Sequence, residues 1–84
     1  MKHEGRSVVR LNDKTTHDGE VISASGPTVL GQRAALDGDM THCPRCGGEF
    51  AIQADGAGAR HEGRVYAYAD AKTACGARLI ASLE

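Results

Sequence analysis

The feature that most constrains the fold is a short segment that occurs three times in the chain. Its copies are Leu11–His17, Asp37–Cys43 and Ala69–Cys75. Each copy contains a threonine followed two positions later by a histidine or a cysteine, and these two residue types are the usual ligands of structural zinc. The copies end 26 and 32 residues apart, so the chain uses a unit of about thirty residues three times.

Short segments that favour β-strands lie between these copies. They contain β-branched or aromatic residues and are separated by turn sequences such as Asp18-Gly19 and Glu62-Gly63. The expected strands cover residues 7–11, 20–23, 28–30, 50–53, 64–68 and 78–81. Many short strands with glycine turns are typical of an all-β fold. We therefore predict three β-hairpin units around one pseudo-threefold axis.

The composition indicates that the core is thin. The chain has 84 residues with 11 glycines, one phenylalanine and no tryptophan, so it has room for one small domain with little apolar surface to bury. Such a scaffold needs a disulfide, a metal or a partner for stability. The three cysteines are an odd number, and in a reducing compartment they favour a metal site over disulfides.

The repeats themselves suggest where a metal would bind. Around a pseudo-threefold axis the equivalent residues His17, Cys43 and Cys75 would converge. A tetrahedral ion needs a fourth ligand, and Cys46 forms a C-x2-C pair with Cys43. The sequence predicts one structural zinc in a closed site, able to supply on the order of 10 kcal/mol of folding free energy. His42 stays an alternative ligand in place of either of these two cysteines.

The pattern does not favour an enzyme. We find no Ser/His/Asp arrangement and no phosphate-binding glycine loop, and the repeated threonine is expected to make a backbone hydrogen bond in each turn. Asp13 and Asp39 could act as a carboxylate pair, but the third copy has Ala71, which favours Asx-type turns over acid/base chemistry. His61, near a turn, is expected to be solvated. A catalytic zinc hydrolase would require an open coordination position.

Charge and hydropathy exclude further classes of partner. The formal net charge of −1 gives no basic surface for nucleic acid. We see no apolar run long enough for a signal peptide or a stable membrane insertion, so we expect synthesis in the cytoplasm. The alternative function is a zinc-ribbon-like binding module. That reading depends on the single C-x2-C pair, whereas such modules usually have a second pair and a basic face.

Three segments of the chain resemble the PAAR-repeat (proline-alanine-alanine-arginine) proteins, the spike-tip proteins of type VI secretion systems. The segments are Val9–Gly19, Gly38–Pro44 and Asp70–Gly76, and the resemblance covers roughly residues 7–82. The chain departs from the family at the motif that gives it its name, because Arg33-Ala34-Ala35-Leu36 stands where Pro-Ala-Ala-Arg would be.

The resemblance implies a small cone of β-hairpins with zinc bound near its apex. His17 and Cys75 match ligand positions of the family, whereas Cys46, together with Cys43 or His42, replaces family histidines. The base of the cone would sit on the blunt end of the trimeric valine-glycine repeat spike.

The function that follows from the resemblance is structural. The chain would be a single PAAR-like domain over residues 1–84, with its core at about 7–82 and no effector extension. It would cap the spike, sharpen it for membrane piercing and assist effector delivery, with effector proteins as further partners. It would leave the cell on the spike, into the extracellular space or a target cell.

Overall fold

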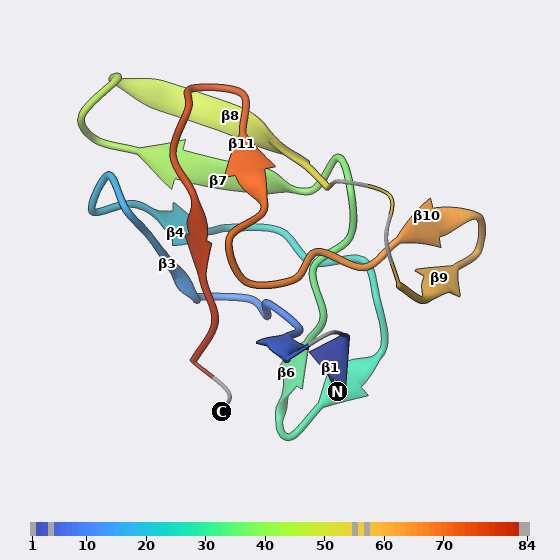
Figure 1. The fold of residues 1–84 in the computed structure, drawn as a ribbon. Helices are drawn as coiled ribbons and strands as arrows, with labels where there is room; N and C mark the ends of the chain where they lie inside the picture. Colours follow the sequence, from blue (N-terminus) through green and yellow to red (C-terminus); the bar gives the residue numbers. More distant parts are fainter. Residues whose placement is uncertain (1, 4, 55, 57, 83–84) are drawn as a thin grey trace.

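The computed structural model describes residues 2–3, 5–54, 56 and 58–82. Within these residues the chain forms strands, turns and loops and has no helix, so the all-β prediction is confirmed (Figure 1). The strands are β1 Lys2–His3, β2 Arg6–Ser7, β3 Lys14–Thr15, β4 Glu20–Val21, β5 Thr28–Val29, β6 Gln32–Arg33, β7 Met40–Cys43, β8 Gly48–Gln53, β9 Arg60–His61, β10 Arg64–Val65, β11 Lys72–Thr73 and β12 Leu79–Ile80.

One sheet of six antiparallel strands forms most of the wall of the molecule. Its strand order is β11-β8-β7-β4-β3-β12, and a single bridge between Lys72 and Arg78 connects its two edges. The sheet is therefore nearly closed on itself. Three separate two-stranded hairpins, β1–β2, β5–β6 and β9–β10, lie on the other side of the molecule from the tip of the β7–β8 hairpin (Figure 1). We call these three hairpins the base.

The three units meet at a closed ring of backbone hydrogen bonds. The Val9 amide donates to the Ala67 carbonyl at 2.8 Å, the Ala67 amide to the Ala35 carbonyl at 2.9 Å, and the Ala35 amide to the Val9 carbonyl at 2.8 Å. Each unit thus gives one bond and receives one, which confirms the predicted pseudo-threefold arrangement. Isolated bridges surround this ring at Val8 with Tyr68, Arg10 with Ala34, and Leu36 with Tyr66.

The core around this ring is small and is built from equivalent residues of the units. The central cluster comprises Val9, Val21, Ala35, Ile52, Ala67, Ala71 and Leu79. A second cluster lies toward the base and comprises Val8, Ala34, Leu36, Tyr66 and Tyr68. Two of the three ring residues, Ala35 and Ala67, have small side chains, which lets the three backbones approach closely. This close approach leaves little room for large apolar side chains, in agreement with the thin core predicted from the composition.

A left-handed residue turns the chain back at the same place in every unit. Asn12, Gly38 and Asp70 have φ angles of 72°, 88° and 71°. Asparagine, glycine and aspartate are the residues that adopt this conformation at least cost. The amides of these residues donate to the carbonyls of equivalent core residues, Val21, Ile52 and Leu79. The local sequence therefore directs each unit from the ring toward the end of the molecule that carries His17, Cys43 and Cys75.

Two expectations about local structure differ from what is found. The strands are shorter than predicted, because the chain leaves the β1–β2 hairpin after Ser7 and the β9–β10 hairpin after Val65, and the residues that follow then pair with two different neighbours. The aspartates do not form Asx turns with the residues that follow them. Instead, the Asp13 carboxylate accepts the Arg10 amide three positions earlier, at 2.9 Å.

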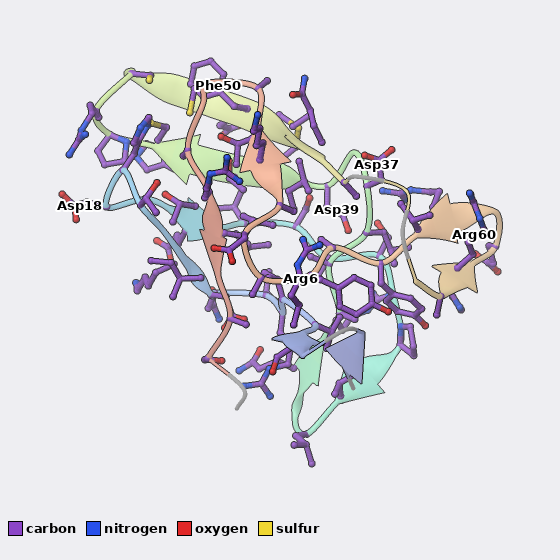
Figure 2. All side chains as sticks on the ribbon, in the orientation of Figure 1. Arg6, Asp18, Asp37, Asp39, Phe50 and Arg60 are labelled. Carbon is purple, nitrogen blue, oxygen red and sulfur yellow. The ribbon has the colours of Figure 1, made fainter. Side chains whose placement is uncertain are left out.

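The same carboxylates also join neighbouring units. Asp39 accepts the Leu36 amide at 2.8 Å and the Ser25 hydroxyl at 2.6 Å, and Asp13 accepts the Ser82 hydroxyl at 2.7 Å. Asp39 lies in the middle of the molecule, between elements of two units (Figure 2). These buried carboxylates therefore act as clamps between repeats, a role that the sequence pattern did not reveal.

Candidate metal centre

The four residues predicted as metal ligands come together at the end of the six-stranded sheet. The ligand atoms of His17, Cys43, Cys46 and Cys75 all lie within 4.8 Å of one another. The His17 Nδ1 atom is 3.6 Å from the Cys43 Sγ atom and 3.8 Å from the Cys75 Sγ atom. Zinc with tetrahedral angles and ordinary bond lengths holds a nitrogen and a sulfur about 3.6 Å apart. The donor set thus fits a single metal ion.

Three hairpin turns carry these side chains, and a buried threonine fixes each turn. The Thr15 hydroxyl accepts the Gly19 amide at 3.1 Å, and the Thr73 hydroxyl accepts the Ala77 amide at 3.2 Å. In the middle unit the Thr41 hydroxyl donates to a carbonyl of β8 at 2.9 Å. The expectation of a threonine–backbone hydrogen bond in each turn is confirmed. In Figure 2, Asp18 and Phe50 mark this end of the molecule, which we call the apex.

The fourth candidate ligand comes from a difference in length between the hairpins. In the first and third hairpins the threonine bonds a residue four positions later. In the middle hairpin Thr41 bonds Phe50, nine positions later. The additional residues contain Cys46, whose amide donates to the Cys43 Sγ atom at 3.4 Å. The pseudo-threefold arrangement therefore supplies three candidate ligands, and one longer turn supplies a fourth, which is the number that a tetrahedral ion would need.

Gly19 lets the first turn approach the strand that carries Cys43. A Cβ atom at Gly19 would overlap the carbonyl oxygen of His42 and lie 3.0 Å from the Thr15 hydroxyl oxygen. The next residue on β7 is Cys43, so this close approach places His17 beside the Cys43 thiol. Only glycine fits there.

Sequence comparison gives one match that decides the family. The PAAR motif model matches residues 1–81. This chain belongs to the PAAR motif family. It is therefore a PAAR-type spike-tip protein of the type VI secretion family. A search of curated proteins gives no significant match. None of the described residues forms a helix long and apolar enough to cross a membrane.

The three thiols of this PAAR chain differ in burial, and the pKa values of Cys75 and Cys46 are shifted in opposite directions. Cys43 is buried, Cys75 is half-buried and Cys46 is exposed. Burial alone would raise the pKa of Cys75, but hydrogen bonds with the Thr73 hydroxyl and the Ala77 amide lower it to about 6. A hydrogen bond with Cys43, together with desolvation, raises the pKa of Cys46 to about 11. If all three cysteines are to be thiolates at neutral pH this close together, a bound cation would have to balance their charge.

The other histidines considered from the sequence lie outside this cluster. His42 is exposed on β7, between two buried residues of the strand. Because side chains alternate along a strand, His42 faces away from the side on which Cys43 lies. His61 is in β9 of the base, half-buried rather than freely solvated, with its ring centroid 6.4 Å from that of Tyr66. The PAAR fold thus brings His17 to the cysteines and leaves these two histidines elsewhere.

Proposed function

We propose that this PAAR chain binds one structural zinc ion through His17, Cys43, Cys46 and Cys75. The convergence of the four donor atoms within 4.8 Å supports this proposal most strongly. Three thiolates and one imidazole are a donor set that favours zinc over harder cations. Four protein ligands leave no coordination position for water, so the ion holds structure and performs no catalysis.

The ion would replace a hydrophobic core at the apex. The central apolar cluster includes no residue of the three turns at 16–19, 43–48 and 74–77, and within these turns only Cys43 and Ala77 are buried apolar residues. Those turns therefore gain little from apolar burial and have mainly their hydrogen bonds to hold them together. A metal bound by all three turns fixes their relative positions, as it does in other small zinc domains.

We further propose that the base caps the end of the trimeric valine-glycine repeat spike. The hydrogen-bond ring formed by Val9, Ala35 and Ala67 gives the chain the approximate symmetry of a trimer. A pseudo-threefold base meets a threefold partner with three similar contacts, so one chain can bind one trimer without a symmetry mismatch. The family match supports this partner.

In this function the chain is a mechanical part and not an enzyme. The apex points away from the spike and, pinned by zinc, stays folded when the spike is driven through a membrane. The chain leaves the cell with the spike, and effector proteins travel on the same assembly.

Calorimetry with the zinc-loaded chain and its cognate spike trimer tests this function. We expect a stoichiometry of one chain per trimer and a dissociation constant of micromolar or below. A chain unfolded by removal of zinc is the control and should not bind. No heat of binding at micromolar concentrations, or three chains bound per trimer, would contradict the capping proposal.

A further inference from the structure

One exposed leucine in the base is not explained by the stability of the fold. Leu30 is 79% exposed, which makes it the most exposed large hydrophobic side chain among the described residues. Its φ angle is 48°, in the left-handed region that a branched side chain adopts only at a cost. Neither burial nor backbone preference therefore favours leucine at this position.

The equivalent hairpins of the base show what the turn requires. Leu30 and Gly31 form the tip of the β5–β6 hairpin with φ angles of 48° and 91°, and Glu62 and Gly63 form the tip of β9–β10 with 51° and 82°. Both tips have the two positive φ angles of a type I′ turn, for which Asn-Gly and Asp-Gly are preferred. A Glu-Gly pair also stands between β1 and β2 in the sequence. Leucine thus departs from the Glu-Gly pair that the sequence has at both other positions.

The tip that carries Leu30 is held firmly by its neighbours. The Arg10 Nη1 atom donates to the Val29 carbonyl at 2.9 Å and to the Leu30 carbonyl at 2.8 Å. The Arg10 Nη2 atom donates to the Ser82 hydroxyl at 2.9 Å. One arginine of the first unit therefore ties the hairpin of the second unit to the end of the third. A side chain on such a fixed tip loses little conformational freedom when it binds a partner.

We infer that Leu30 is the apolar anchor of the base, and that it inserts into an apolar pocket at the end of the spike trimer. This inference rests on the capping function proposed above. The β5–β6 hairpin lies in the base, on the opposite side of the molecule from the apex (Figure 1), which is the side that would face the spike. A trimer offers three equivalent pockets, and the chain fills one of them with leucine, whereas the equivalent tip of the β9–β10 hairpin presents Glu62 and Gly63.

The substitution Leu30→Asn separates binding from folding. Asparagine suits the left-handed tip, so the variant should unfold at a midpoint a few degrees above that of the parent chain. It removes the apolar side chain, so the dissociation constant for the spike trimer should rise about ten- to hundredfold. Binding is measured by calorimetry with both proteins at matched zinc content, and unfolding by circular dichroism.

Two control variants complete the experiment. Glu62→Asn makes the same backbone change at the tip of the β9–β10 hairpin and should leave the dissociation constant within about twofold. Leu30→Met keeps an apolar side chain and should also keep binding within a few-fold. If the parent chain binds the trimer and Leu30→Asn binds equally well, the anchor role is wrong while capping stands. If Glu62→Asn weakens binding as much as Leu30→Asn, the anchor role is also wrong. If the parent chain itself does not bind, capping fails and the anchor fails with it.

Discussion

The apex and the ring layer are built by the same repeat but are stabilised by different interactions. In the ring layer, small apolar side chains such as Val9, Ala35 and Ala67 pack at 0% exposure around a ring of backbone hydrogen bonds. At the apex the equivalent turns converge on thiols and an imidazole. The ring layer is thus stable through burial, whereas in the proposed site the apex would be stabilised by a metal bound to these ligands.

This difference explains why one unit can lose a repeated residue in the ring layer, whereas a proposed ligand position at the apex cannot lose its ligand. The third unit has Ala71 where the other two have Asp13 and Asp39, and Ala71 simply joins the apolar cluster. A ligand at the apex has no such substitute, because a tetrahedral ion with three protein ligands becomes an open site. The predictions below test this contrast from the largest expected effect to the smallest.

Removal of the metal should have the largest effect. Cys43→Ala deletes the buried ligand of the proposed site, and we expect a loss on the order of 10 kcal/mol of metal-coupled folding free energy, enough to unfold the chain. A chelator should do the same to the parent chain. Thermal unfolding by circular dichroism, with zinc content measured in parallel, reports both. His42→Ala is the control and should keep both its zinc and its unfolding midpoint. Equal loss of zinc in that control would bring back His42 as a ligand.

The next largest effect is expected where the first turn contacts β7. Gly19→Ala would push a methyl group into the carbonyl oxygen of His42, which forces the backbone to move. We expect a loss of about 4 kcal/mol and weaker zinc binding. Gly76→Ala is the matched variant, because that glycine has a φ of 89° but open space around it. Its cost should be about 1 kcal/mol. Similar losses in the two variants would show that the close approach is unimportant.

The ring layer should respond to burial alone. Leu79 is 1% exposed and its neighbour Ile80 is 49% exposed. Leu79→Ala should therefore lower the free energy of unfolding by about 3 kcal/mol through cavity formation, and Ile80→Ala by less than about 1 kcal/mol. Denaturant unfolding of the zinc-loaded proteins measures both values. A larger loss for Ile80→Ala would be inconsistent with the burial described for the sheet.

The smallest of these effects concerns the clamp between units. Asp39→Ala leaves the buried amide of Leu36 without its acceptor and removes an ion pair with Arg64, whose Nη2 atom lies 3.2 Å from the Asp39 carboxylate. We expect a loss of about 2 kcal/mol with zinc content unchanged. Since Ala71 occupies the equivalent position in the third unit, the chain should still fold. Complete unfolding of this variant would mean that the clamp, and not the ring, holds the units together.

The sequence predicted the features that depend on chemistry and repetition. Three equivalent segments indicated the three units, and the residues His17, Cys43 and Cys75 at their ends indicated the converging turns. Cys46 was predicted from the C-x2-C spacing, and its thiol does lie among the other donor atoms. Its role as a metal ligand stays a prediction.

Other features could not be predicted, because they depend on where the units meet. The clamp between Asp13 and Ser82 joins residues 69 positions apart, and no local pattern marks such a pair. The strands are mostly two residues long, too short to show the alternation that identifies a strand in a sequence. The hydrogen bond from Arg10 to the Leu30 carbonyl likewise forms only in the assembled fold.

The most direct test of the metal-bound apex is X-ray absorption spectroscopy of the zinc-loaded chain. The proposed site predicts one zinc per chain, with three sulfur atoms at about 2.3 Å and one nitrogen atom at about 2.0–2.1 Å. A shell of two sulfur and two nitrogen atoms would show that His42 or another histidine replaces a cysteine. A well-folded chain that binds no zinc would contradict the account of the apex altogether.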